Sequence, residues 1–383
     1  MRKLNEEERE ITPELLLELS RALREKSKEL TDIVLNLSRI RNDLRKILEM
    51  NGFITKLRAT SENIVGYAID SSFAEALPLV AGDFFLVTGG YVRYPRSDGG
   101  KKRNAGLIVR VKFQSSQIQS HRVISAYAHT VEREIALKLL ENMDDFNVIF
   151  IDGPIIPFYL TFIPEEKLYP EESELISITD KLVEACRERK LSIIGIVKRV
   201  RSRFLISAIK NLVSKSLYEQ LSIVANDKSL GSLILERGEA IKLGSIKQKG
   251  HILKALMMDN ENRNVQDFIA SHKWFSEQFF SVIKPRKSKQ IVMAEVLDFA
   301  NIGIDEILAW INAHATHTGC PQILDQVDGL VKVTSSLLEI ARRLLTRILA
   351  DNLRKTGEFK DFEILEILME YADLQKKFAP RMG

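Results

Sequence analysis

Two aspartates that each end a largely apolar run are the residues of this sequence with the clearest capacity for chemistry. Asp70 follows the run at residues 64–69, Asp152 follows the run at 147–151, and a small residue comes directly after each acid. Carboxylates at the ends of neighbouring strands can hold two divalent ions, which activate water and stabilise the leaving oxyanion in phosphodiester hydrolysis. Mg2+ and Mn2+ prefer such oxygen ligands. The pair predicts a metal-binding carboxylate cluster, although either aspartate alone could be a turn residue or helix cap.

A third acid is expected on the helix between these two runs. The helical pattern at residues 129–142 carries Glu132 and Glu134. Because the two glutamates are two residues apart, they lie on different faces of the helix, and only one can face the aspartates. The apolar positions Ile135 and Leu139 do not separate them decisively. We prefer Glu134 as the third acid and keep Glu132 as the alternative.

The elements that must position these acids follow a recognisable order. Strand patterns and helix patterns alternate in the first half of the chain. Their order is three strands, helix, strand, helix, strand, which is that of the ribonuclease H-like fold. We therefore predict an α/β protein whose core, at about residues 60–205, is a mixed five-stranded sheet flanked by helices. The expected strands are 64–70, 83–94 with a turn or bulge at Gly89-Gly90, 105–113, 147–151 and 191–198, and the expected helices are 129–142 and 172–189.

Helical additions are expected on both sides of this core. A Thr-Pro start and helical spacing of apolar residues predict one or two helices at 12–50. We divide the chain into an N-terminal helical segment (1–55), a main domain (56–350) and a C-terminal helix (351–383). Within the second half, we expect helices at 203–223, 302–316, 333–352 and 360–378 and a strand at 291–297, whereas 230–243 fits either a helix or a strand.

Composition limits the class of protein. The 383 residues are 45% hydrophobic and 28% charged with a net charge of +4, so any affinity for nucleic acid must come from a local patch. Two distant cysteines make neither a disulfide framework nor a zinc site. The acidic N-terminus is unlike a signal peptide, and no apolar run reaches the roughly 18 residues of a membrane span. We expect a cytoplasmic protein without a membrane partner.

One local basic patch follows the last strand of the expected core. Residues 190–215 carry seven basic residues and no acidic one, and Arg199, Arg201 and Arg203 come first after the strand. Such a density neutralises phosphates and provides sequence-independent affinity for DNA. A solvated surface is the ordinary explanation of a charge run. The position beside the expected carboxylate cluster gives DNA binding equal weight with that explanation.

The segments 68–72 (AIDSS), 149–154 (IFIDGP) and 194–203 (IGIVKRVRSR) resemble, in sequence, order and spacing, segments of the NurA nucleases of archaea. The segments 226–230 (NDKSL) and 319–321 (GCP) resemble later segments of that family. The resemblance covers about residues 60–345 and implies a manganese-dependent DNA nuclease, with Mg2+ as a possible substitute, that has 5′-to-3′ exonuclease and single-strand endonuclease activity. It further implies a ribonuclease H-like core, a homodimer, and a partnership with a HerA-type hexameric ATPase in DNA-end resection.

The resemblance also assigns roles to residues. Asp70, Glu134 and Asp152 would take the metal-ligand positions, and Lys198 would lie near the scissile phosphate. The C-terminal segment departs from the family, because Cys320 stands at the usual tyrosine position, Asp328 at the usual histidine and Met293 at the usual arginine. Asp328 can still serve as a metal ligand, because aspartate binds the same ions.

Two other functions stay open beside the nuclease. One is a catalytically weakened paralogue that acts as a structural subunit and binds DNA or the translocase. The other is a nucleotide-binding phosphotransferase of the same broad fold. The second would need additional glycine-rich phosphate-binding turns, which the sequence does not contain.

Overall fold

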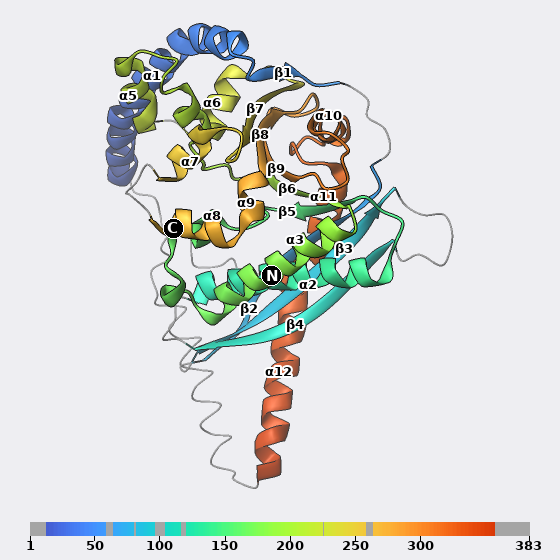
Figure 1. The fold of residues 1–383 in the computed structure, drawn as a ribbon. Helices are drawn as coiled ribbons and strands as arrows, with labels where there is room; N and C mark the ends of the chain where they lie inside the picture. The colour runs from blue at the N-terminus through green and yellow to red at the C-terminus, as the bar shows by residue number, and fades with distance from the viewer. Residues whose placement is uncertain are drawn as a thin grey trace.

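A single nine-stranded sheet with helices on both faces organises the molecule (Figure 1). The computed structural model describes residues 13–58, 64–79, 82–95, 104–115, 120–224, 226–257 and 263–356. Its strand order is β1-β7-β8-β9-β6-β5-β2-β3-β4. The strands are β1 (Ile54–Lys56), β2 (Gly66–Leu79), β3 (Gly82–Tyr94), β4 (Ala105–Ser115), β5 (Val148–Asp152), β6 (Ser192–Val197), β7 (Glu239–Ser245), β8 (Phe279–Lys284) and β9 (Val292–Leu297).

The helices connect and cover these strands. Among the described residues they are α1 (Pro13–Met50), α2 (Ser120–Asn142), α3 (Pro170–Glu188), α4 (Phe204–Ile209), α5 (Lys215–Val224), α6 (Asp227–Ile234), α7 (Gly250–Met257), α8 (Arg263–Ser271), α9 (Lys273–Glu277), α10 (Ile304–His314), α11 (Gln322–Val331) and α12 (Ser335–Thr356), with 3-10 turns at Phe158–Phe162 and Glu165–Lys167.

One half of the sheet is the predicted ribonuclease H-like core. β2, β3 and β4 form an antiparallel meander, and β5 and β6 continue the sheet in parallel from β2. The helices α2 and α3 come between these strands in the predicted order. The predicted class is therefore confirmed. The sheet is larger than the predicted five strands, because β9 pairs antiparallel with β6 and brings β8, β7 and β1 with it.

The sheet is buried on both faces where it carries the acids. Along β5, Ile149 and Ile151 join one hydrophobic cluster, and Val148 and Phe150 join the other. Residues of α2 and α3 belong to the first cluster, and residues of α10 and α11 belong to the second. A strand between two such layers needs a continuous apolar run, which is the pattern that the sequence shows at 148–151.

Glycines 89 and 90 were expected to turn the chain, but β3 runs straight through them. A Cβ at Gly89 would lie 2.7 Å from Val131 of α2, and one at Gly90 would lie 2.9 Å from Val331 of α11. The two glycines therefore let helices approach the sheet closely on opposite faces.

Other expected elements differ in length or number. α1 is one continuous helix, α2 begins nine residues earlier than expected, and residues 203–223 form two helices instead of one. The ambiguous 230–243 contains both the end of α6 and the start of β7. α12 projects from the body in Figure 1. The helix expected at 360–378 lies outside the described residues, and the division into three segments stays a prediction. None of the described helices has the length and apolar character needed to cross a membrane.

Candidate metal centre

Three carboxylates converge at the edge where β2 and β5 separate. Asp70 of β2, Asp152 at the end of β5 and Asp328 of α11 each offer a ligand oxygen, and the three atoms lie within 4.8 Å of one another. Asp70 is buried and Asp328 is exposed, so the cluster opens to solvent on the α11 side. The structure thus brings together Asp70, Asp152 and Asp328. Asp328 is the residue that stands in place of a histidine in the C-terminal segment.

Strand register explains this convergence. β2 and β5 pair in parallel from Gly66↔Val148 to Ile69↔Ile151, so Asp70 and Asp152 come directly after the paired stretch. The first strand was expected to end at residue 70, but β2 continues to Leu79 in its pairing with β3. Because side chains alternate between the two faces along a strand, Asp70 points to the same face of the sheet as Ala68, and Asp152 points to the same face as Phe150. Ala68 and Phe150 both belong to the cluster under α10 and α11. The two aspartates therefore emerge on that face, where α11 supplies the third.

The three acids are held together at an electrostatic cost. Burial raises the pKa of Asp70 to about 9, and the neighbouring Asp152 and Glu132 add to the shift. Burial also raises the pKa of Asp152 to about 6, although Lys198 opposes that change. A divalent cation would relieve this repulsion, and an all-oxygen donor set suits Mg2+ or Mn2+. The residues present therefore fit the metal that the sequence implies.

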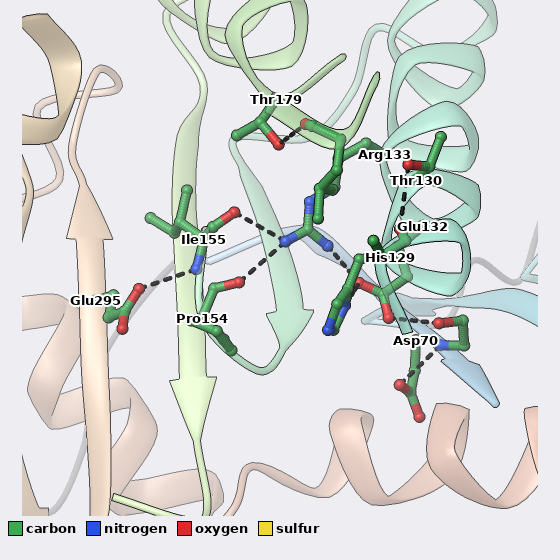
Figure 2. A network of polar contacts seen from close by, with 12 residues as sticks. Asp70, His129, Thr130, Glu132, Arg133, Pro154, Ile155, Thr179 and Glu295 are labelled. Carbon is green, nitrogen blue, oxygen red and sulfur yellow. Dashed lines mark hydrogen bonds and ion pairs between the residues drawn. The ribbon is translucent and has the colours of Figure 1, made fainter. Parts of the chain in front are cut away.

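Glu132, which lies near Asp70 in Figure 2, is the glutamate whose charge acts on Asp70 and Asp152. Glu132 is fully buried, accepts a hydrogen bond from Ser71 Oγ (2.6 Å), and lies 3.1 Å from His129 Nδ1. Burial alone would raise its pKa, but His129, Arg133 and Ser71 together lower it. Glu134 instead forms an ion pair with Arg110 of β4 and is not brought to the cluster. The two faces of α2 thus separate the two glutamates, against our preference.

Lys198 forms an ion pair with one of the three aspartates. Its Nζ donates a 2.5 Å hydrogen bond to Asp152 Oδ2. Burial alone would lower the pKa of Lys198, but the charge of Asp152 and this bond raise it. Lys198 therefore carries a positive charge at the edge of the cluster. Its expected place near the scissile phosphate stays a prediction.

The basic segment after β6 lies on the surface beside Lys198. Arg199 and Arg201 are exposed, Arg203 is partly exposed, and Val200 between them is buried. The buried Val200 anchors this irregular segment, and Arg199 and Arg201 on either side of it face solvent. The arrangement leaves the first two guanidinium groups available to an anionic ligand.

A buried aspartate fixes the shape of this basic segment. Asp227 accepts hydrogen bonds from Ser202 Oγ (2.7 Å) and from the backbone N–H groups of Phe204 and Leu205 (both 2.9 Å). Lys228 next to it donates to the carbonyl of Lys198 at 3.0 Å. The start of α6 thus holds both ends of the segment and caps the first turn of α4.

The loop that follows Asp152 depends on two glycines. Gly153 has φ of +128°, which side chains rarely allow, and Gly195 of β6 lies under the loop. A Cβ at Gly195 would come 2.7 Å from Gly153 O and 3.0 Å from Ile155 N, and these backbone atoms cannot rotate away.

Gly195→Ala should therefore destabilise the protein by about 1–3 kcal/mol, because the loop must shift to admit a methyl group. The free energy of unfolding in urea measures this. Gly250→Ala is the matched control, since nothing lies within 4 Å of its Cβ position. Equal stabilities of the two variants would contradict the close-packing account.

Sequence patterns did not identify Ser71, Arg133 and Asp227 as site residues. Ser71 follows the predicted acid, Arg133 follows the less favoured glutamate, and Asp227 lies in a segment noted only for its resemblance. An arginine adjacent to a glutamate on an otherwise apolar helix face was the available signal for Arg133.

The fold and site define a ribonuclease H-like α/β protein with a carboxylate cluster at the edge of its central strands. A NurA domain family model matches residues 64–333, more than half of the chain. The chain belongs to the NurA family. No curated protein sequence matches it.

Solved structures of NurA proteins share the fold at low sequence identity. The NurA nuclease from Sulfolobus solfataricus aligns with a TM-score of 0.52 and 13% identity over 86% of this chain and 98% of that one. A structure of NurA with manganese aligns at 0.51 and 13% identity, covering 85% and 98% of the two chains. A NurA bound to dAMP and manganese aligns at 0.50 and 12%, covering 82% and 94%.

Proposed function

We propose that this protein is a divalent-metal-dependent DNA nuclease that hydrolyses phosphodiester bonds at the cluster of Asp70, Asp152 and Asp328. The convergence of these three carboxylates on one face of a NurA-family fold carries the proposal. Mn2+ is the proposed ion, with Mg2+ as a substitute, because related structures hold manganese and the donor set is all oxygen.

The chain's own residues have distinct tasks in this proposal. Asp70, Asp152 and Asp328 hold the cation, which would supply Lewis-acid activation of water and of the phosphate. We place Glu132 at the fourth acidic position instead of Glu134, because it is held beside Asp70 by Ser71 and its negative charge acts on both Asp70 and Asp152. Lys198 places a positive charge beside Asp152, where it can neutralise the phosphate that enters.

DNA is the proposed substrate because the surface next to the cluster is basic. Arg199, Arg201 and Arg203 follow Lys198 directly, and contacts of this kind bind the phosphate backbone without reading sequence. A related NurA structure contains dAMP, which supports a nucleotide at the corresponding place. The specific activities proposed are 5′-to-3′ exonuclease on duplex ends and endonuclease on single strands.

We also propose a homodimer and a HerA-type hexameric ATPase as protein partners, in the cytoplasm. An apolar surface on the edge strand β4 supports a protein partner, because its side chains alternate outward and are about half exposed. Patches of this kind commonly mark contacts between proteins. The surface consists of Leu107, Val109, Val111 and Phe113.

Metal-dependent cleavage by the purified full-length chain tests the proposal. Labelled single-stranded and duplex DNA should be cut with Mn2+ but not with excess EDTA, and Asp70→Ala should abolish the cutting. The matched control is Asp180→Ala, whose carboxylate pairs with His272 and Trp274 away from the cluster. Cleavage that is independent of metal, or undiminished in Asp70→Ala, would sink the nuclease proposal.

The same assay addresses the weakened paralogue. Cys320 is buried in the turn before α11 and lacks the reach of the tyrosine that the family carries there. DNA binding at wild-type strength with no cleavage in either Mn2+ or Mg2+ would favour a structural subunit.

A further inference from the structure

Arg133 connects three segments of the site through one buried side chain (Figure 2). Its Nη1 donates to Glu132 Oε2, the neighbouring residue on α2. Its Nη2 donates to the carbonyls of Pro154 (3.0 Å) and Ile155 (2.8 Å), in the loop that leaves Asp152. Glu132 in turn accepts from Ser71, which follows Asp70 on β2. One guanidinium group therefore links α2 to the loop after β5 and, through Glu132, to Ser71 of β2.

A fully buried arginine is costly unless it is paired and hydrogen-bonded. Arg133 has no exposed surface, and its burial lowers its pKa while Glu132 opposes that change. A well-packed apolar side chain would usually serve stability equally well at such a position. An arginine differs from an apolar side chain because its planar guanidinium group donates several hydrogen bonds at once. Here it donates to Glu132 on one side and to the two loop carbonyls on the other.

The loop that Arg133 contacts is also held from its other side. Ile155 N donates to Glu295 Oε2 of β9 at 2.9 Å, and Gln278 Nε2 donates to the same oxygen at 2.7 Å. The backbone at 154–155 is thus bound by its carbonyls to α2 and by an N–H group to β9. Loss of the Arg133 bonds would free the loop from α2, which carries Glu132, but the bond from Ile155 N to Glu295 would remain. The spacing between Glu132 and Asp152 would then no longer be fixed.

We propose that Arg133 is a positioning residue of the metal centre, which fixes the distance between Glu132 on α2 and Asp152 on β5. It does so by binding the Glu132 carboxylate and the backbone of the loop after Asp152 with the same guanidinium group. This role rests on the proposed function, because it assumes that the carboxylate cluster binds a divalent cation. Because Arg133 is fully buried, it would act on the cation only through Glu132 and the loop.

The affinity for Mn2+ tests this role directly. Arg133→Met removes the charge and the fork, and Arg133→Lys keeps the charge but cannot bind the glutamate and both carbonyls together. The dissociation constant, measured by calorimetry and by the electron spin resonance signal of free Mn2+, should rise about 10- to 100-fold in Arg133→Met. Arg133→Lys should fall between that value and the wild type. In the cleavage assay, kcat at saturating Mn2+ should fall while KM for DNA stays unchanged.

Arg93 provides the matched control for a purely structural effect. It is a buried arginine of β3 that pairs with Asp145 (2.7 Å) and Tyr67 (3.0 Å), and none of its partners is an acid of the cluster. Arg93→Met and Arg93→Lys should lower the melting temperature yet leave the Mn2+ dissociation constant within about twofold of wild type, because distant sites act independently.

The outcomes separate the two levels of the proposal. A wild-type protein that does not bind Mn2+, or an Asp70→Ala variant that binds it equally, defeats the proposed function. A wild type that binds Mn2+ while Arg133→Lys and Arg133→Met bind it as tightly defeats the positioning role. An equal loss of affinity in the Arg93 variants also defeats it, since the effect would then come from the fold as a whole. If Arg133→Met does not fold, Arg133→Lys decides.

Discussion

Glu132→Gln should slow DNA cleavage by about 100-fold, the upper end of the effect seen when groups that support a metal site are changed. Glu132 is buried against Ser71 and His129 and is electrostatically coupled to Asp70 and Asp152. The change removes one negative charge from the site and keeps the size of the side chain. Initial rates on labelled single-stranded DNA with Mn2+ measure the effect.

Glu134→Gln is the matched control, because it makes the same change two residues away on the same helix. The side chains of Glu134 and Arg110 are 26% and 31% exposed, and such an ion pair contributes at most about 1 kcal/mol to stability. Its rate should stay within about twofold of wild type, since the charge lost is outside the cluster. A 100-fold loss in Glu134→Gln with a normal rate in Glu132→Gln would reverse the assignment.

Folding must be checked in the same variants, because Glu132→Gln leaves the charge of buried Arg133 without its carboxylate partner. Circular dichroism and the melting temperature show whether the variant is folded. Glu132→Asp retains the charge but withdraws it by one methylene group from Ser71. A partial loss of activity in a stable Glu132→Asp variant would therefore support a positional requirement.

Asp70 and Asp152 could be predicted as candidate site residues because local sequence marks them. A continuous apolar run marks a strand buried on both faces, and an acid that directly follows such a run marks a polar position on that strand. The parallel pairing of β2 and β5 then brings Asp70 and Asp152 together. The order of elements predicted a ribonuclease H-like sheet with these two strands as neighbours, and the structure shows that they pair in parallel.

The choice between Glu132 and Glu134 could not be made in this way. Both residues follow the same helical pattern, and the deciding partners come from distant parts of the chain, Ser71 for one and Arg110 for the other. The same limit applies to Gly89 and Gly90. Two adjacent glycines fit a turn, but here helices from both faces of the sheet require them. Contacts between distant parts of the chain therefore decide which glutamate lies near Asp70 and why the two glycines are needed, and a local sequence pattern does not contain those contacts.

Glu295 should make the free energy of unfolding depend strongly on pH. This fully buried carboxyl group accepts two hydrogen bonds at Oε2, from Ile155 N and Gln278 Nε2. Burial raises its pKa from the ordinary 4.5 to about 8, against the opposing effects of those bonds and of Arg133. The folded protein thus holds this proton more tightly than the unfolded chain does. The stability that it provides is complete below 4.5 and is lost as the pH rises through about 8.

Glu295→Gln should remove this dependence, because the amide imitates the protonated carboxyl group and does not titrate. Relative to wild type, the metal-free variant should gain about 4 kcal/mol in free energy of unfolding between pH 5 and pH 9. Urea denaturation in EDTA across that range measures the difference. Subtracting the two curves cancels the contributions of Asp70, Asp152 and Asp227, which are present in both proteins.

Glu239→Gln is the informative control, because Glu239 is also a buried glutamate but its pKa is shifted in the opposite direction. Arg45 binds both of its carboxylate oxygens at 2.8 Å and lowers its pKa. Its contribution to stability is present above its ordinary pKa and is lost as the pH falls. Glu239→Gln should therefore destabilise the protein by a constant amount from pH 6 to pH 9. Parallel stability curves for wild type and Glu295→Gln would show that Glu295 stays ionised in the folded protein, and that the loop after Asp152 is anchored by a charge instead of a neutral acid.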